Sequence, residues 1–249
     1  MARASTPIAH VILVLSAVLG GVSLLGFGLV LALGPFELVP LGLGSSAALV
    51  WDAGLCLVFF VQHSGMIRRS FRERLGRLLP ARYHAAVYSI ASGAALLPLI
   101  VLWQRTPVWL TLDGPLRGAL RGAFVLAGLG FLWAVRSLGS FDTFGLAPIR
   151  AHLRGVEPRT LPLAIRGPYR WVRHPLYSLF LVLLWACPDV TAGRLLFNAL
   201  FTAWLVVGTH LEERDLVRQF GEFYREYQRQ VPMLVPWKRP DRSSNGATP

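Results

Sequence analysis

The N-terminal part of the chain contains a long uncharged run that excludes an ordinary soluble fold. From residue 4 to residue 36 there is no Asp, Glu, Lys or Arg. A helix needs about 20 apolar residues to cross the hydrocarbon core of a bilayer, whereas the apolar part of a secretory signal peptide is only ~7–15 residues long. The run therefore predicts a retained membrane-spanning helix over residues 8–33.

Further apolar stretches follow along the chain. We expect six spans in all, at residues 8–33, 47–66, 83–104, 118–138, 175–187 and 195–211. The last two are short and are joined by residues 188–194, which indicates a tight helical hairpin. The predicted fold class is all-α, a polytopic bundle of membrane helices that forms one domain over residues 1–240. Residues 241–249 are expected to be a polar, disordered tail.

The distribution of charge predicts an orientation for these spans. Charged residues make up only 15% of the chain, against about 25% in a typical soluble domain. With six spans, 21 of the 25 Arg and Lys residues fall on one side, and the other four are Arg105, Arg117, Arg121 and Arg194. The positive-inside rule then places both termini in the cytoplasm. The net charge of +12 is thus explained by anionic lipid as the partner, without nucleic acid.

One segment combines an Arg, a His and a Pro at the expected start of the fifth span. It reads RHPLY at residues 173–177. Pro175 suits the first turn of a helix, where its missing N–H costs nothing, and helix N-termini attract anions. Arg173 and His174 in that place suit a carboxylate group. The alternative is an interfacial anchor of Arg, Tyr and Trp side chains at the end of a span.

Two carboxylates, Glu212 and Glu213, close the sixth span within the sequence LEERDL. Acidic side chains at a membrane boundary are costly, which favours a functional role such as binding the ammonium group of a ligand. The alternative is that both pair with the abundant Arg side chains.

An aromatic stretch, FGEFYREY at residues 220–227, comes next. Gly221 predicts a break in the helix, and Tyr224 and Tyr227 share one face of the helix that follows. Two interpretations are open. The stretch is either an amphipathic helix on the membrane surface or a lid over a cytoplasmic cavity, with its rings toward a flat ligand group.

Two weaker candidates for a catalytic base are His63, in VQHS, and Asp142, in FDTFG. Either is otherwise an ordinary interfacial residue. The sequence has no phosphate loop, GxSxG elbow, HExxH zinc motif or dinucleotide-binding fingerprint. Cys56 and Cys187 both lie in apolar runs and make neither a disulfide framework nor a metal pair, so no metal is expected.

Together these segments resemble the integral membrane methyltransferases, which include isoprenylcysteine carboxyl methyltransferases and phospholipid N-methyltransferases. The C-terminal pattern consists of RHPLY, LEERDL, FGEFYREY and VPMLVP, the last at residues 231–236. The segments VQHSGMIR, FDTFGL, HLRG and WACPDVTAGRLLF are similar to the bacterial methanethiol S-methyltransferase branch, which is related to NnrU-type proteins. The resemblance covers about residues 51–237 and implies a bacterial inner-membrane protein. The charge distribution described above predicts that its active site faces the cytoplasm.

The resemblance implies S-adenosylmethionine as the methyl donor, bound by the part of the domain at about residues 139–237. Its carboxylate is expected to meet Arg173, with His174 on the carboxylate or the ribose. Glu212 or Glu213 is expected to meet its ammonium group, and tyrosines are expected to pack near the adenine. The cofactor-binding residues implied are Tyr169, Arg173, His174, Tyr177, Glu212, Glu213, Tyr224 and Tyr227.

The resemblance further implies that methanethiol, a small lipophilic substrate entering from the bilayer, is methylated to dimethyl sulfide. Because the thiolate is the nucleophile, a proton must leave, and His63, Asp142 or a water takes it. The alternatives are another lipophilic acceptor (a prenylcysteine carboxylate, an isoprenoid or a phospholipid amine), a nicotinamide-dependent membrane reductase, or a non-catalytic NnrU-like protein.

Four positions depart from the family patterns. Leu179 stands where the superfamily usually has Gly, and Tyr177 stands where the methanethiol branch usually has Met. Gly139 and Ser140 stand where that branch usually has Asn-His. These departures bear on the acceptor more than on the cofactor.

Overall fold

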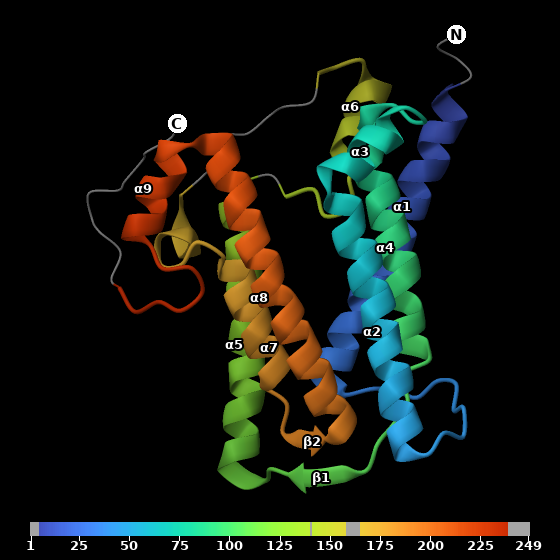
Figure 1. The fold of residues 1–249 in the computed structure, drawn as a ribbon, viewed down its shortest axis with the longest axis vertical. Coiled ribbons are helices and arrows are strands. Elements are labelled where there is room, and N and C mark those ends of the chain that lie inside the picture. Colours follow the sequence, from blue (N-terminus) through green and yellow to red (C-terminus); the bar gives the residue numbers. More distant parts are fainter. Residues whose placement is uncertain (1–4, 140, 158–164, 239–249) are drawn as a thin grey trace. The chain divides into compact units, whose positions relative to one another are not determined.

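The computed structural model describes residues 5–139, 141–157 and 165–238 (Figure 1). Ser140 and the tail at residues 241–249 lie outside these ranges, as do four of the 21 basic residues counted on the cytoplasmic side: Arg3, Arg159, Arg239 and Arg242. In the described part, five helices are long and apolar enough to cross a membrane: Pro7–Leu33, Ser45–Ile67, Ala81–Val101, Gly114–Ser137 and Ala192–Phe220. The chain is therefore an integral membrane protein of the all-α, polytopic class.

The chain divides into two compact units, and the first comprises residues 1–108, 142–159 and 191–197. Its elements are α1 (Ser5–Leu33), α2 (Ser45–Ile67), α3 (Arg69–Gly76), η1 (Ala81–Tyr83), α4 (His84–Val101) and α6 (Ala147–Arg154). Helix α4 packs against both α1 and α2. The first three predicted spans are thus helices, with ends within a few residues of those expected.

Glycine permits the close packing in this unit. A Cβ atom at Gly93 of α4 would lie 2.9 Å from the carbonyl oxygen of Leu19 in α1, and one at Gly145 would lie 2.3 Å from the carbonyl carbon of Ala85. Real Cβ atoms do not approach so closely. Gly145 also has φ +66°, which favours glycine. Larger side chains at either position would push apart backbones that now touch.

A buried arginine ties the end of α1 to the segment that begins α8. Arg194 is 6% exposed, and its guanidinium group donates to the carbonyl oxygens of Val30 and Leu31 at 3.2 and 3.1 Å. The last carbonyl groups of a helix have no partner within the helix. The oxygen of Val30 also accepts from the N–H of Gly34 at 2.9 Å. Arg194 therefore supplies a donor to Leu31 and a second donor to Val30 in an apolar environment.

The second unit comprises residues 109–141, 160–190 and 198–249. Its elements are α5 (Gly114–Ser137), η2 (Gly167–Arg170), α7 (Pro175–Trp185), α8 (Ala192–Phe220) and α9 (Glu222–Gln230). Two short strands, β1 (Val108–Thr111) and β2 (Asp189–Thr191), pair with each other. Arg117 at the start of α5 is held by Asp189 at 2.6 Å. The predicted hairpin is confirmed, because α7 and α8 are joined only by the short connection that contains β2.

Helix α7 is the exception to the predicted set of spans. It has 11 residues and is therefore about 16 Å long, which is shorter than the hydrocarbon core of ~30 Å. It packs against α5, where Leu179 comes within 3.0 Å of the position that a Cβ on Gly130 would take. The leucine that replaces the usual glycine thus lies over a glycine of the neighbouring helix.

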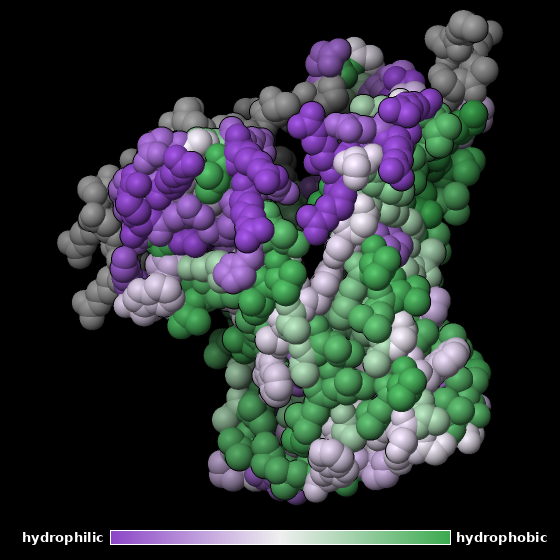
Figure 2. Space-filling model, viewed as in Figure 1, coloured by the Kyte–Doolittle hydropathy of each residue, from purple (hydrophilic) through white to green (hydrophobic). Residues whose placement is uncertain are grey.

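Hydrophilic side chains gather at one end of each unit (Figure 2). In the first unit they surround α3 and α6, and in the second they surround α9 and the C-terminal end of α8. The long helices behind these ends present mainly hydrophobic side chains. This is the pattern of a membrane protein with its polar chemistry at the end of the spans.

Candidate active site

The site in the second unit is built around Arg173, which lies just before α7. Its guanidinium group forms two parallel hydrogen bonds of 2.8 Å with the carboxylate of Glu213 on α8, and both side chains are 9% exposed. The remaining Nη1 group donates to the carbonyl oxygens of Gln228 and Val231. Four of the five N–H groups of the guanidinium are thus used within the protein.

Glu213 is the hub of this arrangement. In addition to Arg173, it accepts hydrogen bonds from His174 Nε2 at 2.8 Å and from the Tyr224 hydroxyl at 2.9 Å. The amide of Gln228 donates to its second oxygen. A buried carboxylate needs such partners, since an unpaired charge in this setting is very costly. Glu213 therefore joins α8, α9 and the start of α7, and its oxygens are occupied by protein groups.

Residues 231–234, which follow α9, close over the start of α7. The backbone N–H of Arg173 donates to the carbonyl oxygen of Pro232 at 2.9 Å. The hydroxyl of Ser178, one turn into α7, donates to the carbonyl oxygen of Leu234 at 2.7 Å. Residues 231–234, called the strap below, thus hold the backbone of Arg173 in place.

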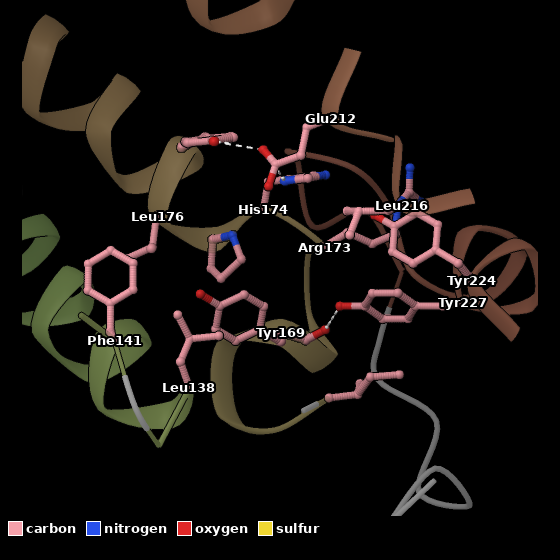
Figure 3. Close-up of a pocket in the computed structure, with 13 residues that line it drawn as sticks. Leu138, Phe141, Tyr169, Arg173, His174, Leu176, Glu212, Leu216, Tyr224 and Tyr227 are labelled. Carbon is pink, nitrogen blue, oxygen red and sulfur yellow. Dashed lines mark hydrogen bonds and ion pairs between the residues drawn. The ribbon is translucent and has the colours of Figure 1, made fainter. Parts of the chain in front are cut away.

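A cavity of about 290 Å³ opens beside this network (Figure 3). It is lined by Leu138, Phe141, Ile165, Tyr169, Arg173, His174, Pro175, Leu176, Tyr177, Glu212, Leu216, Tyr224 and Tyr227. The structure therefore brings seven of the eight expected cofactor-binding residues to one cavity. The eighth, Glu213, lies behind them in the network.

The two neighbouring glutamates have different surroundings. The side chain of Glu212 is 44% exposed and faces the cavity, where it accepts a hydrogen bond of 2.7 Å from the Tyr177 hydroxyl. Tyr177 in turn stacks on His174, with ring centroids 5.5 Å apart and planes 2° from parallel. The sequence left two interpretations open for these glutamates, pairing with arginine or binding the ammonium group of a ligand. Glu213 pairs with arginine, whereas Glu212 presents a carboxylate that a cationic ligand group can reach.

Three tyrosines line the cavity as neutral hydrogen-bonding groups. Burial and the nearby charge of Glu212 raise the pKa of Tyr169 to about 12. Burial also raises the pKa values of Tyr224 and Tyr227. All three hydroxyls therefore stay protonated at neutral pH. Tyr227 donates its hydrogen to the backbone oxygen of Tyr169, which ties α9 to η2 at the edge of the cavity.

The two candidate bases lie in the first unit, whereas every residue that lines the cavity belongs to the second. His63 on α2 is 2.6 Å from the hydroxyl of Tyr88 on α4. The carboxylate of Asp142 accepts hydrogen bonds from the N–H groups of Leu146 and Ala147 at 2.9 and 2.8 Å and so caps the start of α6. A catalytic role for either residue stays a prediction.

Sequence reasoning missed Gln228, which bonds Glu213 through its side chain and Arg173 through its carbonyl group. A signal was present: Gln228 follows Tyr224 by four residues and therefore shares its face of α9. The apolar side chains that line the cavity, including Leu176 and Leu216, could not be predicted from the sequence, because leucine is common throughout the chain.

The fold and the cavity together define the class, an α-helical integral membrane protein with a ligand-sized site at the polar end of its C-terminal helices. The methanethiol S-methyltransferase of Pseudomonas sp. (strain GM41(2012)) is 40% identical over 207 residues, which cover 80% of this chain and 79% of the relative. That of Mycobacterium tuberculosis is 36% identical over 192 residues, covering 76% and 79%. The chain belongs to the methanethiol S-methyltransferase family.

A more distant relative is Nurim of Bos taurus, which is 29% identical over 181 residues and 68% of each chain. No solved structure and no protein-family model matches the chain. The resemblance drawn from the sequence motifs is confirmed by these relatives.

Proposed function

We propose that the protein transfers a methyl group from S-adenosylmethionine to methanethiol and so produces dimethyl sulfide. The observation that carries the proposal is the cavity that gathers Tyr169, Arg173, His174, Tyr177 and Glu212 in a chain of this family. The family relationship also argues against the other classes considered, a nicotinamide-dependent reductase and a non-catalytic NnrU-like protein, and against a lipid or prenylcysteine acceptor.

The side chains of the cavity fit the charges of S-adenosylmethionine. Glu212 offers a carboxylate to the ligand ammonium, and its exposure leaves room for that contact. Among the described residues, Glu213 and two carbonyl groups take four of the five N–H groups of Arg173, so the fifth is available to the ligand carboxylate. Tyrosine rings bind onium cations through their faces, which suits a sulfonium centre and explains why so many line one cavity.

S-adenosylmethionine supplies a methyl group on a positively charged sulfur. In the transfer the acceptor sulfur forms a bond to the methyl carbon while the bond to the donor sulfur breaks, and the electron pair of that bond stays on the donor sulfur as a thioether. The thiol proton is released. Because the displacement is in line, the protein contributes mainly by positioning, and the Arg173–Glu213 pair holds the walls of the cavity in place.

Removal of the thiol proton is the step for which we propose a base. His63 and Asp142 are the candidates, with a water as the alternative. The carboxylate of Asp142 already accepts two backbone hydrogen bonds, from the N–H groups of Leu146 and Ala147. The ring of His63 lies 2.6 Å from the hydroxyl of Tyr88, and neither candidate is preferred over the other.

We further propose that both termini and the cavity face the cytoplasm of a bacterial cell, in its inner membrane. The support is the charge distribution: basic residues concentrate in the loops that flank α3 and α6 and in the C-terminal part, as the positive-inside rule requires. Such an orientation gives the cavity access to a cytoplasmic methyl donor.

The proposal is tested by expressing the chain in a host without this activity and supplying methanethiol. Dimethyl sulfide in the headspace above the level of an empty-vector control is the expected result. No increase from cells whose membranes contain the protein would contradict the assignment of the acceptor.

A further inference from the structure

The cavity in the second unit has two chemically different ends. In Figure 3, Leu138, Phe141 and Leu176 lie together at one end, and Glu212, Arg173 and the α9 tyrosines lie at the other. Tyr169 and His174 lie between the two groups. A ligand that fills the cavity would therefore meet charged and hydrogen-bonding groups at one end and hydrocarbon at the other.

The apolar end lies where a membrane helix stops. Leu138 directly follows α5, and Leu176 is the second residue of α7, which packs against α5. Phe141 remains 46% exposed. A small apolar thiol dissolves in the bilayer, so an apolar opening beside the end of a span is a suitable entry for it.

The hydroxyl group of Tyr169 points to this end. The ring of Tyr169 extends from its backbone toward Leu138 (Figure 3), and the hydroxyl forms no hydrogen bond with any residue in the described ranges. Tyr169 is half-buried, and its hydroxyl lines the cavity as a hydrogen-bond donor that a ligand can reach. A sulfur atom held at the apolar end would accept this hydrogen bond.

We propose that Leu138, Phe141 and Leu176 form the subsite for the methyl acceptor and limit it to short alkyl thiols. The inference rests on the proposed function. The space is small, because a cavity of about 290 Å³ lies just below the usual range of ligand pockets, ~300–1,000 Å³, and the acceptor would share it with the methyl donor. A tight apolar pocket discriminates a single methylene by roughly 10–200-fold.

The test compares acceptors of increasing length. The full chain, in lipid nanodiscs with saturating S-adenosylmethionine, is assayed with methanethiol, ethanethiol and 1-propanethiol. Three variants enlarge the proposed subsite: Leu138→Ala, Phe141→Ala and Leu176→Ala. The matched control, Leu216→Ala, removes the same side chain from the opposite end of the cavity, close to Tyr224 (Figure 3).

The subsite variants are expected to raise the ratio of kcat/KM for 1-propanethiol to that for methanethiol by about tenfold or more, with the affinity for S-adenosylmethionine unchanged. Leu216→Ala is expected to weaken that affinity and leave the ratio unchanged. Should an alanine variant fail to fold, Leu176→Val and Phe141→Leu make the same comparison with a smaller change of volume.

The inference is overturned if the wild-type protein methylates methanethiol but none of the three subsite changes shifts the ratio. It is also overturned if Leu216→Ala shifts the ratio as much as they do. A folded wild-type protein that methylates no thiol would contradict the proposed function itself, and the subsite with it. The two failures are therefore distinguishable.

Discussion

Arg173 and Glu213 form a buried ion pair with two parallel hydrogen bonds of 2.8 Å, 40 residues apart in the chain. The pair joins the start of α7 to α8, and its remaining atoms reach α9 and the strap at residues 231–234. A bidentate pair of this kind fixes direction as well as distance. The cavity keeps its shape because the side chains behind its polar wall are locked in place.

Glu213→Gln is expected to destabilise the protein. The new amide would place N–H groups against the donors of Arg173 or Gln228, and breaking a buried pair costs about 3–5 kcal/mol. Such a loss lowers Tm by roughly 6–20 °C at ~2–4 °C per kcal/mol, which a thermal melt in detergent measures. Asp215→Asn, in an exposed pair on the same helix, is the control and should leave Tm unchanged.

Glu212→Gln is expected to weaken cofactor binding and leave Tm within error of the wild type. Glu212 faces the cavity and has no arginine partner among the described residues. The loss of one charge-assisted hydrogen bond, worth ~1.5–3 kcal/mol, corresponds to a rise in Kd of about 10- to 150-fold. Calorimetry with S-adenosylhomocysteine measures it, and an unchanged Kd would remove Glu212 from the ammonium site.

The raised pKa of Tyr169 predicts a fall in stability at alkaline pH. An unfolded tyrosine ionises near pH 10, whereas burial and Glu212 raise the pKa of Tyr169 to about 12. Between these values the unfolded state loses its proton first, so stability falls as pH rises from about 10 to about 12. In Tyr169→Phe this contribution is absent, and Tm should fall less steeply over that range. Equal slopes for both proteins would contradict the assignment.

Arg194→Met is expected to destabilise the first unit. It removes the Arg194 donor of the Leu31 carbonyl group and one of the two donors of the Val30 carbonyl group, which also accepts from the N–H of Gly34, at a cost of roughly 2–4 kcal/mol. Tm should fall by roughly 4–16 °C, while the Kd for S-adenosylhomocysteine at a permissive temperature stays the same. Arg194→Lys, which keeps the charge and one donor direction, should recover part of the loss.

The proposed orientation predicts which loops a thiol reagent reaches. In a background in which Cys56 and Cys187 are replaced by Ser, Arg77→Cys should be labelled by a membrane-impermeant maleimide only after the cells are opened. Asp113→Cys, at the exposed start of α5, should be labelled in intact cells. The reverse pattern would invert the orientation and place the cavity on the outer side.

Much of the fold could be predicted from the sequence, because apolar length and charge are properties of the chain itself. The run over residues 8–33 and the break at Gly221 both appear where expected, in α1 and between α8 and α9. The length of α7 was less predictable. Its apolar residues continue past the helix into the connection at residues 186–188, where Pro188 ends the pattern.

The site was predictable as a set of residues but not as a set of roles. The motifs that contain Tyr169, His174 and Tyr224 named the lining of the cavity in advance. They did not separate Glu212 from Glu213, because adjacent residues on a helix point about 100° apart and only packing decides which one is buried. Nor did they reveal Gln228, whose importance comes from a contact 15 residues away along the chain.

The most direct test of the central claim uses purified protein in nanodiscs, methanethiol and S-adenosylmethionine labelled with ¹³C in its methyl group. The account predicts dimethyl sulfide with the label in one of its two methyl groups, S-adenosylhomocysteine in equal amount, and a strongly reduced rate in Glu212→Gln at low cofactor concentration. A protein that is folded by its thermal melt, yet yields no labelled dimethyl sulfide, would contradict it.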